Sequence, residues 1–163
     1  VIIKLSSFFM KTREDPEPQL PPLLRKCWMR LNAIFQKRVA KVGLTPDQYI
    51  ALRWLNEFPK GSVNQATLKK LMFTDPNNIT GLMGRMEKMG LLERRPDAYD
   101  RRKKLLYITA KGQDLFCKAK VIANQLEEEV LSVLTNKERS EFLGLLGQIN
   151  RFFDPALESR SQH

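Results

Sequence analysis

Apolar residues recur every three to four positions along most of the chain, and turn-forming residues separate these periodic stretches. Spacing of this kind places the apolar side chains along one side of a helix. The expected helices cover residues 23–43, 45–58, 63–73, 76–89, 109–134 and 135–153. The pattern therefore predicts a mainly α-helical protein in which the helix over 109–134 is the longest.

Local sequence signals mark several of these helix ends. Thr45 with Gln48, and Thr135 with Glu138, have the spacing of a capping box, in which two side chains bond the first backbone N–H groups of a helix. Asp75 can accept a hydrogen bond from the first backbone N–H groups of a helix, and the proline after it suits the first helical position. These signals fix the expected starts of the second, fourth and last helices.

Two runs outside the helical pattern read as short extended segments. Leu91–Arg95 and Lys104–Ile108 lie on either side of a polar tip, after a glycine suited to end a helix. Between positions 94 and 104, six arginines and lysines stand against two aspartates. The helices over 63–73 and 76–89 followed by this basic hairpin predict a winged helix-turn-helix. The alternative is an ordinary helix and hairpin with a solvated charged loop.

The charge balance indicates a polyanionic partner. The chain of 163 residues has 28 lysines and arginines against 18 acidic residues, a net charge of +10. Nucleic acid is the first candidate partner and an anionic membrane surface the second. No apolar run approaches the roughly 20 residues that a membrane span needs, and the first ten residues lack the pattern of a secretory signal. We therefore expect a cytoplasmic protein.

The residue types that carry most enzyme chemistry are scarce. The chain has two cysteines, Cys27 and Cys117, and its one histidine is the last residue, His163. No cysteine–histidine cluster, catalytic triad or glycine-rich phosphate loop is present. These features argue against an enzyme and give no reason to expect a metal or a cofactor.

The helix over 76–89 has one apolar and one polar face. Its polar face contains amide and guanidinium groups, which hydrogen-bond base edges, and glycines that let another backbone come close. We expect this face to contact DNA through Asn77, Asn78, Thr80, Gly81, Gly84, Arg85 and Lys88. We expect the bases to be read by the amides of Asn77 and Asn78 and by the side chains of Thr80, Arg85 and Lys88.

The segment after the hairpin tip resembles a known signature. Asp100-Arg101-Arg102, the apolar strand 105–108 and Thr109-x-x-Gly112 are similar to the pattern of the MarR family of bacterial winged-helix regulators. The segments 44–52 and 79–94 also resemble that family. The likeness extends from about Leu23 to Phe153. This sequence differs from the family pattern at Asp75–Asn78, where family members more often have serine and threonine.

The resemblance implies a homodimer with two winged heads, each placing one helix in the major groove of a near-palindromic site. It also implies that Arg102 enters the adjacent minor groove and that Asp100 holds the wing tip. Basic side chains of the hairpin would then contact phosphates: Arg94, Arg95, Arg101 and Lys103. Members of the family commonly repress transcription.

The whole chain is thus expected to be mainly α with a small β-wing. We expect a loosely ordered extension over 1–22, a winged helix-turn-helix domain over 45–108 and a C-terminal tail over 154–163. The helices over 23–44 and 109–153 carry more apolar surface than a small domain covers, so we expect them to form a dimerisation domain. A helical bundle within a monomer is the alternative.

Family members often release DNA when an amphipathic or aromatic effector binds between head and dimer helices. The candidate pocket residues are Trp28, Leu31, Phe35, Tyr49 and Trp54. Aromatic residues at helical spacing are more often plain core, and Cys27 on the same stripe is expected to be a small buried residue rather than a redox sensor. A winged-helix protein-interaction module is the second functional interpretation.

Overall fold

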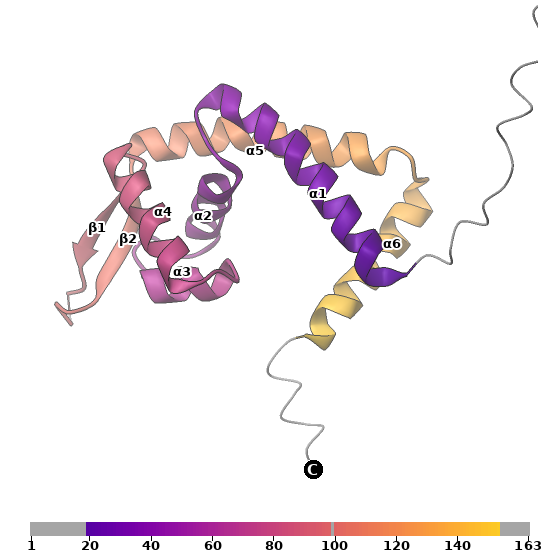
Figure 1. Cartoon of the computed structure of the whole chain (residues 1–163). Coiled ribbons are helices and arrows are strands. Elements are labelled where there is room, and N and C mark those ends of the chain that lie inside the picture. Colours follow the sequence, from indigo (N-terminus) through magenta and orange to yellow (C-terminus); the bar gives the residue numbers. More distant parts are fainter. Residues whose placement is uncertain (1–18, 99, 154–163) are drawn as a thin grey trace, which may run out of the picture.

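The chain is mainly α-helical with one small antiparallel sheet in the residues that the computed structural model describes, 19–98 and 100–153 (Figure 1). The elements are α1 (Leu20–Val39), a 3₁₀ turn (Ala40–Val42), α2 (Pro46–Glu57), α3 (Gln65–Leu71), α4 (Pro76–Lys88), β1 (Leu92–Pro96), β2 (Lys104–Ile108), α5 (Ala110–Leu131) and α6 (Asn136–Phe152). No helix within these ranges has the length and apolar character needed to cross a membrane. The expected fold class is confirmed.

The elements form a compact head and an extended helical part (Figure 1). The head contains α2, α3, α4 and the hairpin, in which Leu92 pairs with Ile108 and Pro96 with Lys104. The backbone N–H of Leu106 also bonds the Val63 carbonyl oxygen at 2.8 Å, which attaches the hairpin to the start of α3. Helix α5 leads from the hairpin across the head, and α1 and α6 lie toward its far end.

The core lies inside the head and under α5. Buried apolar residues come from α2, α3, α4, the hairpin and α5, together with Val39 at the end of α1. The Tyr49 ring of α2 lies between Phe35 of α1, at a centroid distance of 5.1 Å, and Phe116 of α5, at 5.9 Å. Aromatic contacts therefore join the head to both long helices.

The expected helix starts are confirmed. Both capping boxes form, at Thr45 with Gln48 and at Thr135 with Glu138. The Asp75 carboxylate accepts the backbone N–H of Asn78 at 2.8 Å, as an N-cap does. These signals depend on residues three apart in the sequence, so the sequence alone was enough to find them.

The long helices differ from the prediction at three points. Helix α1 begins at Leu20, because prolines are tolerated in a first turn whose N–H groups have no helical partner. Helix α5 ends at Leu131, three residues early. Cys27 is exposed, which corrects its assignment as a buried residue. Residues 1–18 and the tail 154–163, expected to be an extension and a tail, lie outside the described residues.

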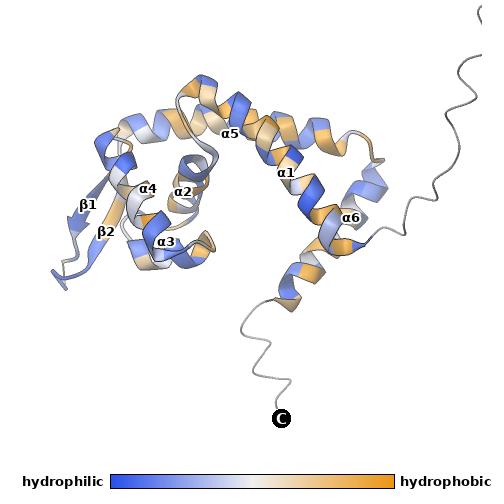
Figure 2. Ribbon diagram, in the orientation of Figure 1, coloured by the Kyte–Doolittle hydropathy of each residue, from blue (hydrophilic) through white to orange (hydrophobic). Residues whose placement is uncertain are grey.

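Much of α1 and of α6 presents apolar side chains to solvent. Figure 2 shows how apolar residues are spread along both helices. On α1 this surface consists of Leu20, Leu23, Leu24, Trp28, Met29 and Ile34; on α6 it consists of Phe142, Leu143, Leu145, Leu146, Ile149, Phe152 and its C-cap Phe153. We call these residues the apical surface. Cys27 lies on the same stretch of α1 and is exposed as well.

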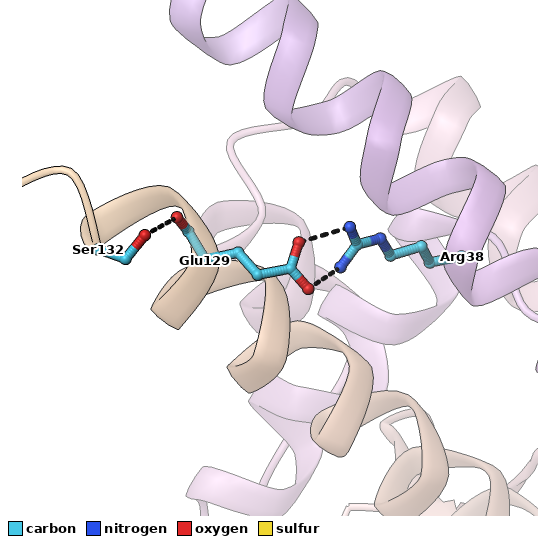
Figure 3. A network of polar contacts seen from close by, with 3 residues as sticks. All are labelled: Arg38, Glu129 and Ser132. Atoms are coloured by element: carbon cyan, nitrogen blue, oxygen red, sulfur yellow. Dashed lines mark hydrogen bonds and ion pairs between the residues drawn. The ribbon is translucent and has the colours of Figure 1, made fainter.

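A bidentate ion pair joins α1 to α5 (Figure 3). The Arg38 guanidinium donates two hydrogen bonds to the Glu129 carboxylate, at 2.7 and 2.6 Å, and the Ser132 hydroxyl donates to the Glu129 carbonyl oxygen. The hydrogen bonds from Arg38 lower the pKa of the Glu129 carboxyl. Arg139 and Glu128 form a similar pair between α6 and α5, so two consecutive glutamates near the end of α5 hold α1 and α6 through arginine–carboxylate contacts.

Candidate nucleic-acid interface

Helix α4 packs on the head through one face and exposes the other. Ile79, Leu82, Met83 and Met86 are buried, which holds α4 against the core. Asn77, Asn78, Thr80, Arg85 and Lys88 are exposed on the remaining surface, with Gly81 and Gly84 between them. The structure thus brings every expected contact residue of this helix to one accessible side.

Two of these side chains already have partners at the start of α4. The Asn78 amide donates to the Asp75 carboxylate at 2.5 Å. The Thr80 hydroxyl donates to the Pro76 carbonyl oxygen at 2.8 Å and accepts from the Gln65 amide at 3.0 Å. Asn77, Arg85 and Lys88 have no hydrogen-bonded partner among the described residues, so they are the most available of the set.

The two glycines differ in what surrounds them. A Cβ on Gly81 would lie 3.2 Å from an Arg85 guanidinium nitrogen, whereas a Cβ on Gly84 would meet nothing within 4 Å. The Arg85 guanidinium therefore lies back over Gly81. Gly84 leaves open space in which another backbone can approach α4.

The hairpin tip is shaped by aspartates. The Asp100 carboxylate accepts the backbone N–H of Arg102 at 3.1 Å, and the Asp97 carboxylate accepts that of Asp100 at 2.9 Å. Lys103 adds an ammonium group 4.0 Å from the Asp100 carboxylate. Arg101 and Arg102 project as exposed cations, neither with an ion-pair partner in the described part of the chain. The tip thus presents two available guanidinium groups on a backbone held by carboxylates.

Two arginines in β1 have partners within the head. The Arg95 guanidinium pairs with Glu93 and lies 4.8 Å from the Tyr107 ring centroid, yet its side chain stays exposed. Arg94 is only 27% exposed, and its guanidinium lies 3.1 Å from the Glu87 carboxylate of α4. Its Nε is buried without a hydrogen-bond partner among the described residues. This position favours a role for Arg94 in fixing the hairpin against α4 over the expected phosphate contact.

Three residues at the start of α5 also position α4. The Thr109 hydroxyl donates to the Gly90 carbonyl oxygen at 2.6 Å, and the Lys111 ammonium donates to that of Met89 at 2.7 Å. A Cβ on Gly112 would lie 2.0 Å from the Leu91 carbonyl oxygen, so only glycine fits there. The Thr-x-x-Gly spacing was visible in the sequence, but its role required the contact with the end of α4.

A cavity of about 800 Å³ lies where α1, α2 and α5 meet. Trp28, Leu31, Phe35 and Tyr49 line it, with Phe116 and the polar side chains of Arg53, Gln113 and Lys120. Burial raises the pKa of the Tyr49 hydroxyl. Trp54 does not line the cavity, because its ring packs toward Phe58 at a centroid distance of 6.4 Å.

Comparison with known proteins gives consistent matches. A model of the MarR family matches residues 42–103. The repressor NicR of Pseudomonas putida is 33% identical over 135 residues, which cover 83% of this chain and 84% of NicR.

Two solved structures resemble the whole described fold. One is Bordetella bronchiseptica BpsR, whose DNA binding is regulated by 6-hydroxynicotinic acid. It is 27% identical in sequence, and the two structures match with a TM-score of 0.73 over 81% of this chain and 93% of BpsR. The other is the repressor CouR, bound to a 23-mer DNA duplex. It is 28% identical and matches with a TM-score of 0.73 over 81% of this chain and 92% of CouR.

Proposed function

Because the chain belongs to the MarR family of transcriptional regulators, we propose that it is a homodimeric repressor that binds a specific double-stranded DNA site. The observation that carries this proposal is the exposed face of α4 beside a hairpin tip with two available arginines. A helix of this width fits the major groove, and a basic hairpin suits the flanking backbone or minor groove. The similar repressor CouR is bound to a DNA duplex in its structure.

Each part of the surface has a proposed role. Amide, guanidinium and ammonium groups of Asn77, Asn78, Arg85 and Lys88 read base edges, with Thr80 at the border of that face. Phosphate contacts come from Arg95, Arg101 and Lys103, and these fix register without reading sequence. Arg102 enters the minor groove, where narrow A·T-rich stretches attract a guanidinium group.

The apical surface supports the homodimer. Its apolar side chains lie on α1 and α6, toward the end of α5 that is farther from the hairpin. An exposed apolar surface of this extent is normally covered by another protein surface. A second copy of the chain would cover it symmetrically, which makes α1, α5 and α6 the dimerisation region and places two heads side by side.

The proposal predicts the form of the DNA site. Selection of bound fragments from random duplex DNA is expected to enrich near-palindromic sequences, since each protomer of a dimer reads one half-site. Sedimentation of the free protein is expected to give the mass of two chains. No enrichment would contradict the DNA-binding function, and a single-chain mass with asymmetric sites would contradict the dimer.

We further propose that an amphipathic aromatic acid binds in the cavity and weakens DNA binding. Four aromatic rings, of Trp28, Phe35, Tyr49 and Phe116, offer packing for an aromatic ring. Arg53 and Lys120 supply cations for a carboxylate, although Glu57 and Glu127 also line the cavity. The relative BpsR is regulated by a molecule of this class.

The effector proposal predicts a response that depends on cavity residues. Added 6-hydroxynicotinic acid is expected to weaken binding to the selected duplex by roughly 5- to 150-fold, the range of typical allosteric coupling. Leu31→Ala, in the cavity but not in the apical surface, is expected to reduce this response, whereas Trp54→Ala, outside the cavity, keeps it. Equal responses in the two variants, measured by gel shift, would contradict the assignment of this cavity. No response of the wild-type chain to this acid or to related aromatic acids would contradict the aromatic-acid class.

A further inference from the structure

Phe73 has an unusual conformation in the turn between α3 and α4. Its φ angle is +49°, the only positive φ of a non-glycine residue in the described ranges. Its N–H bonds the Lys70 carbonyl oxygen at 3.1 Å, and the N–H of Thr74 bonds that of Lys69 at 3.3 Å. These bonds end α3 in a left-handed turn, at the position where glycine is usual.

The ring of Phe73 gains no burial against the described residues. The left-handed conformation costs free energy for any residue with a Cβ. The side chain is 96% exposed, so burial of the ring does not offset this cost. Strained residues that persist in a fold are often found at binding sites. A ring held in this way indicates a contact with another molecule.

The surroundings of Phe73 indicate which molecule. Lys69 and Lys70 lie in the last turn of α3, and the exposed amides of Asn77 and Asn78 lie in the first turn of α4, which begins directly after Asp75. Phe73 thus lies in the turn that leads into the helix proposed to enter the major groove, after two cations that suit phosphates. In that groove the apolar group offered by a base pair is the C5 methyl of thymine.

We propose that Phe73 is a specificity-determining residue whose ring packs on the C5 methyl group of a thymine in each half-site. This inference rests on the proposed DNA-binding function. It adds an apolar contact to a reading surface that is otherwise made of amides, hydroxyls and cations. It also accounts for phenylalanine at a backbone position that favours glycine.

The test replaces thymine by deoxyuridine, one position at a time, in the selected duplex. This change removes the methyl group and leaves the base-pairing edge intact. At one position in each half-site, wild-type affinity is expected to fall about fourfold, the value of one buried methyl-sized group. Phe73→Ala keeps the strained backbone and removes the ring from both protomers. On thymine DNA it is therefore expected to lose about sixteenfold, the loss that wild type shows when both half-sites carry deoxyuridine, and to be insensitive to deoxyuridine.

Matched controls separate the possible failures. Phe58→Ala, at the end of α2, is expected to keep the wild-type response to deoxyuridine. Phe73→Gly is expected to raise the unfolding midpoint while weakening DNA binding, because it relieves the strain of the backbone and removes the ring.

Equal deoxyuridine responses in wild type and Phe73→Ala would overturn the methyl contact while leaving DNA binding intact. A changed dimer mass in Phe73→Ala would assign the ring to a protein contact, and a wild-type chain without duplex binding would refute the proposed function itself.

Discussion

Replacement of Gly112 by alanine is expected to destabilise the fold by about 3 kcal/mol or more, at the upper end of overpacking costs. The added Cβ would lie 2.0 Å from the Leu91 carbonyl oxygen and 2.9 Å from its carbonyl carbon. Both atoms belong to the backbone of the turn after α4, so no side-chain rotation relieves the clash. Denaturant unfolding, followed by helical circular dichroism, measures the loss.

Gly84→Ala is the matched control for this substitution. Gly84 also lies in a helix, but a Cβ there would meet nothing within 4 Å. Alanine is favoured over glycine in helix interiors by up to about 1 kcal/mol, so this variant is expected to be slightly more stable. If both variants unfold at the wild-type midpoint, α5 does not pack on the Leu91 backbone as described.

Replacement of Arg102 by alanine is expected to weaken binding to the selected duplex by roughly 10- to 100-fold, the usual loss for one specific guanidinium contact. The Arg102 side chain is exposed at the hairpin tip and contributes nothing to the core, so folding and dimer mass are expected to stay unchanged. The loss is expected to be largest for sites with A·T-rich flanks, where a narrow minor groove attracts arginine. Gel-shift titration at fixed salt measures it.

Lys137→Ala provides the control for a general loss of positive charge. Lys137 is an exposed cation at the start of α6, far from the hairpin. This variant is expected to bind the duplex almost as tightly as wild type. Unchanged affinity in Arg102→Ala would remove this arginine from the interface, and an equal loss in both variants would show that only net charge matters.

The sequence predicted the features that depend on near neighbours in the chain. Capping by Thr45, Asp75 and Thr135 requires partners only three residues away, and the apolar stripe of α4 follows from helical spacing. The same stripe placed Asn77, Arg85 and Lys88 on the opposite, accessible side. Local chemistry was therefore enough for most of the head.

Features that depend on the tertiary arrangement could not be predicted from spacing. The Arg94 guanidinium pairs with Glu87 on another element, and Trp54 packs toward Phe58 and not into the cavity that Tyr49 of the same helix lines. The exposure of Cys27 depends on what covers α1, which periodicity does not reveal. Spacing identifies a face of a helix, whereas the neighbour of that face is set by the tertiary arrangement.

The contacts of Thr109, Lys111 and Gly112 with the end of α4 couple the orientation of α5 to that of the helix proposed to read DNA. The 22 residues of α5 span about 33 Å. A tilt of about 6° over that length displaces the far end by roughly 3 Å, close to the 3.4 Å separation of successive bases along one strand. A molecule bound beside Phe116, near the start of α5, would thus change the separation of the two helices proposed to read DNA. These helices would then no longer match the spacing of the half-sites, although the molecule contacts neither of them.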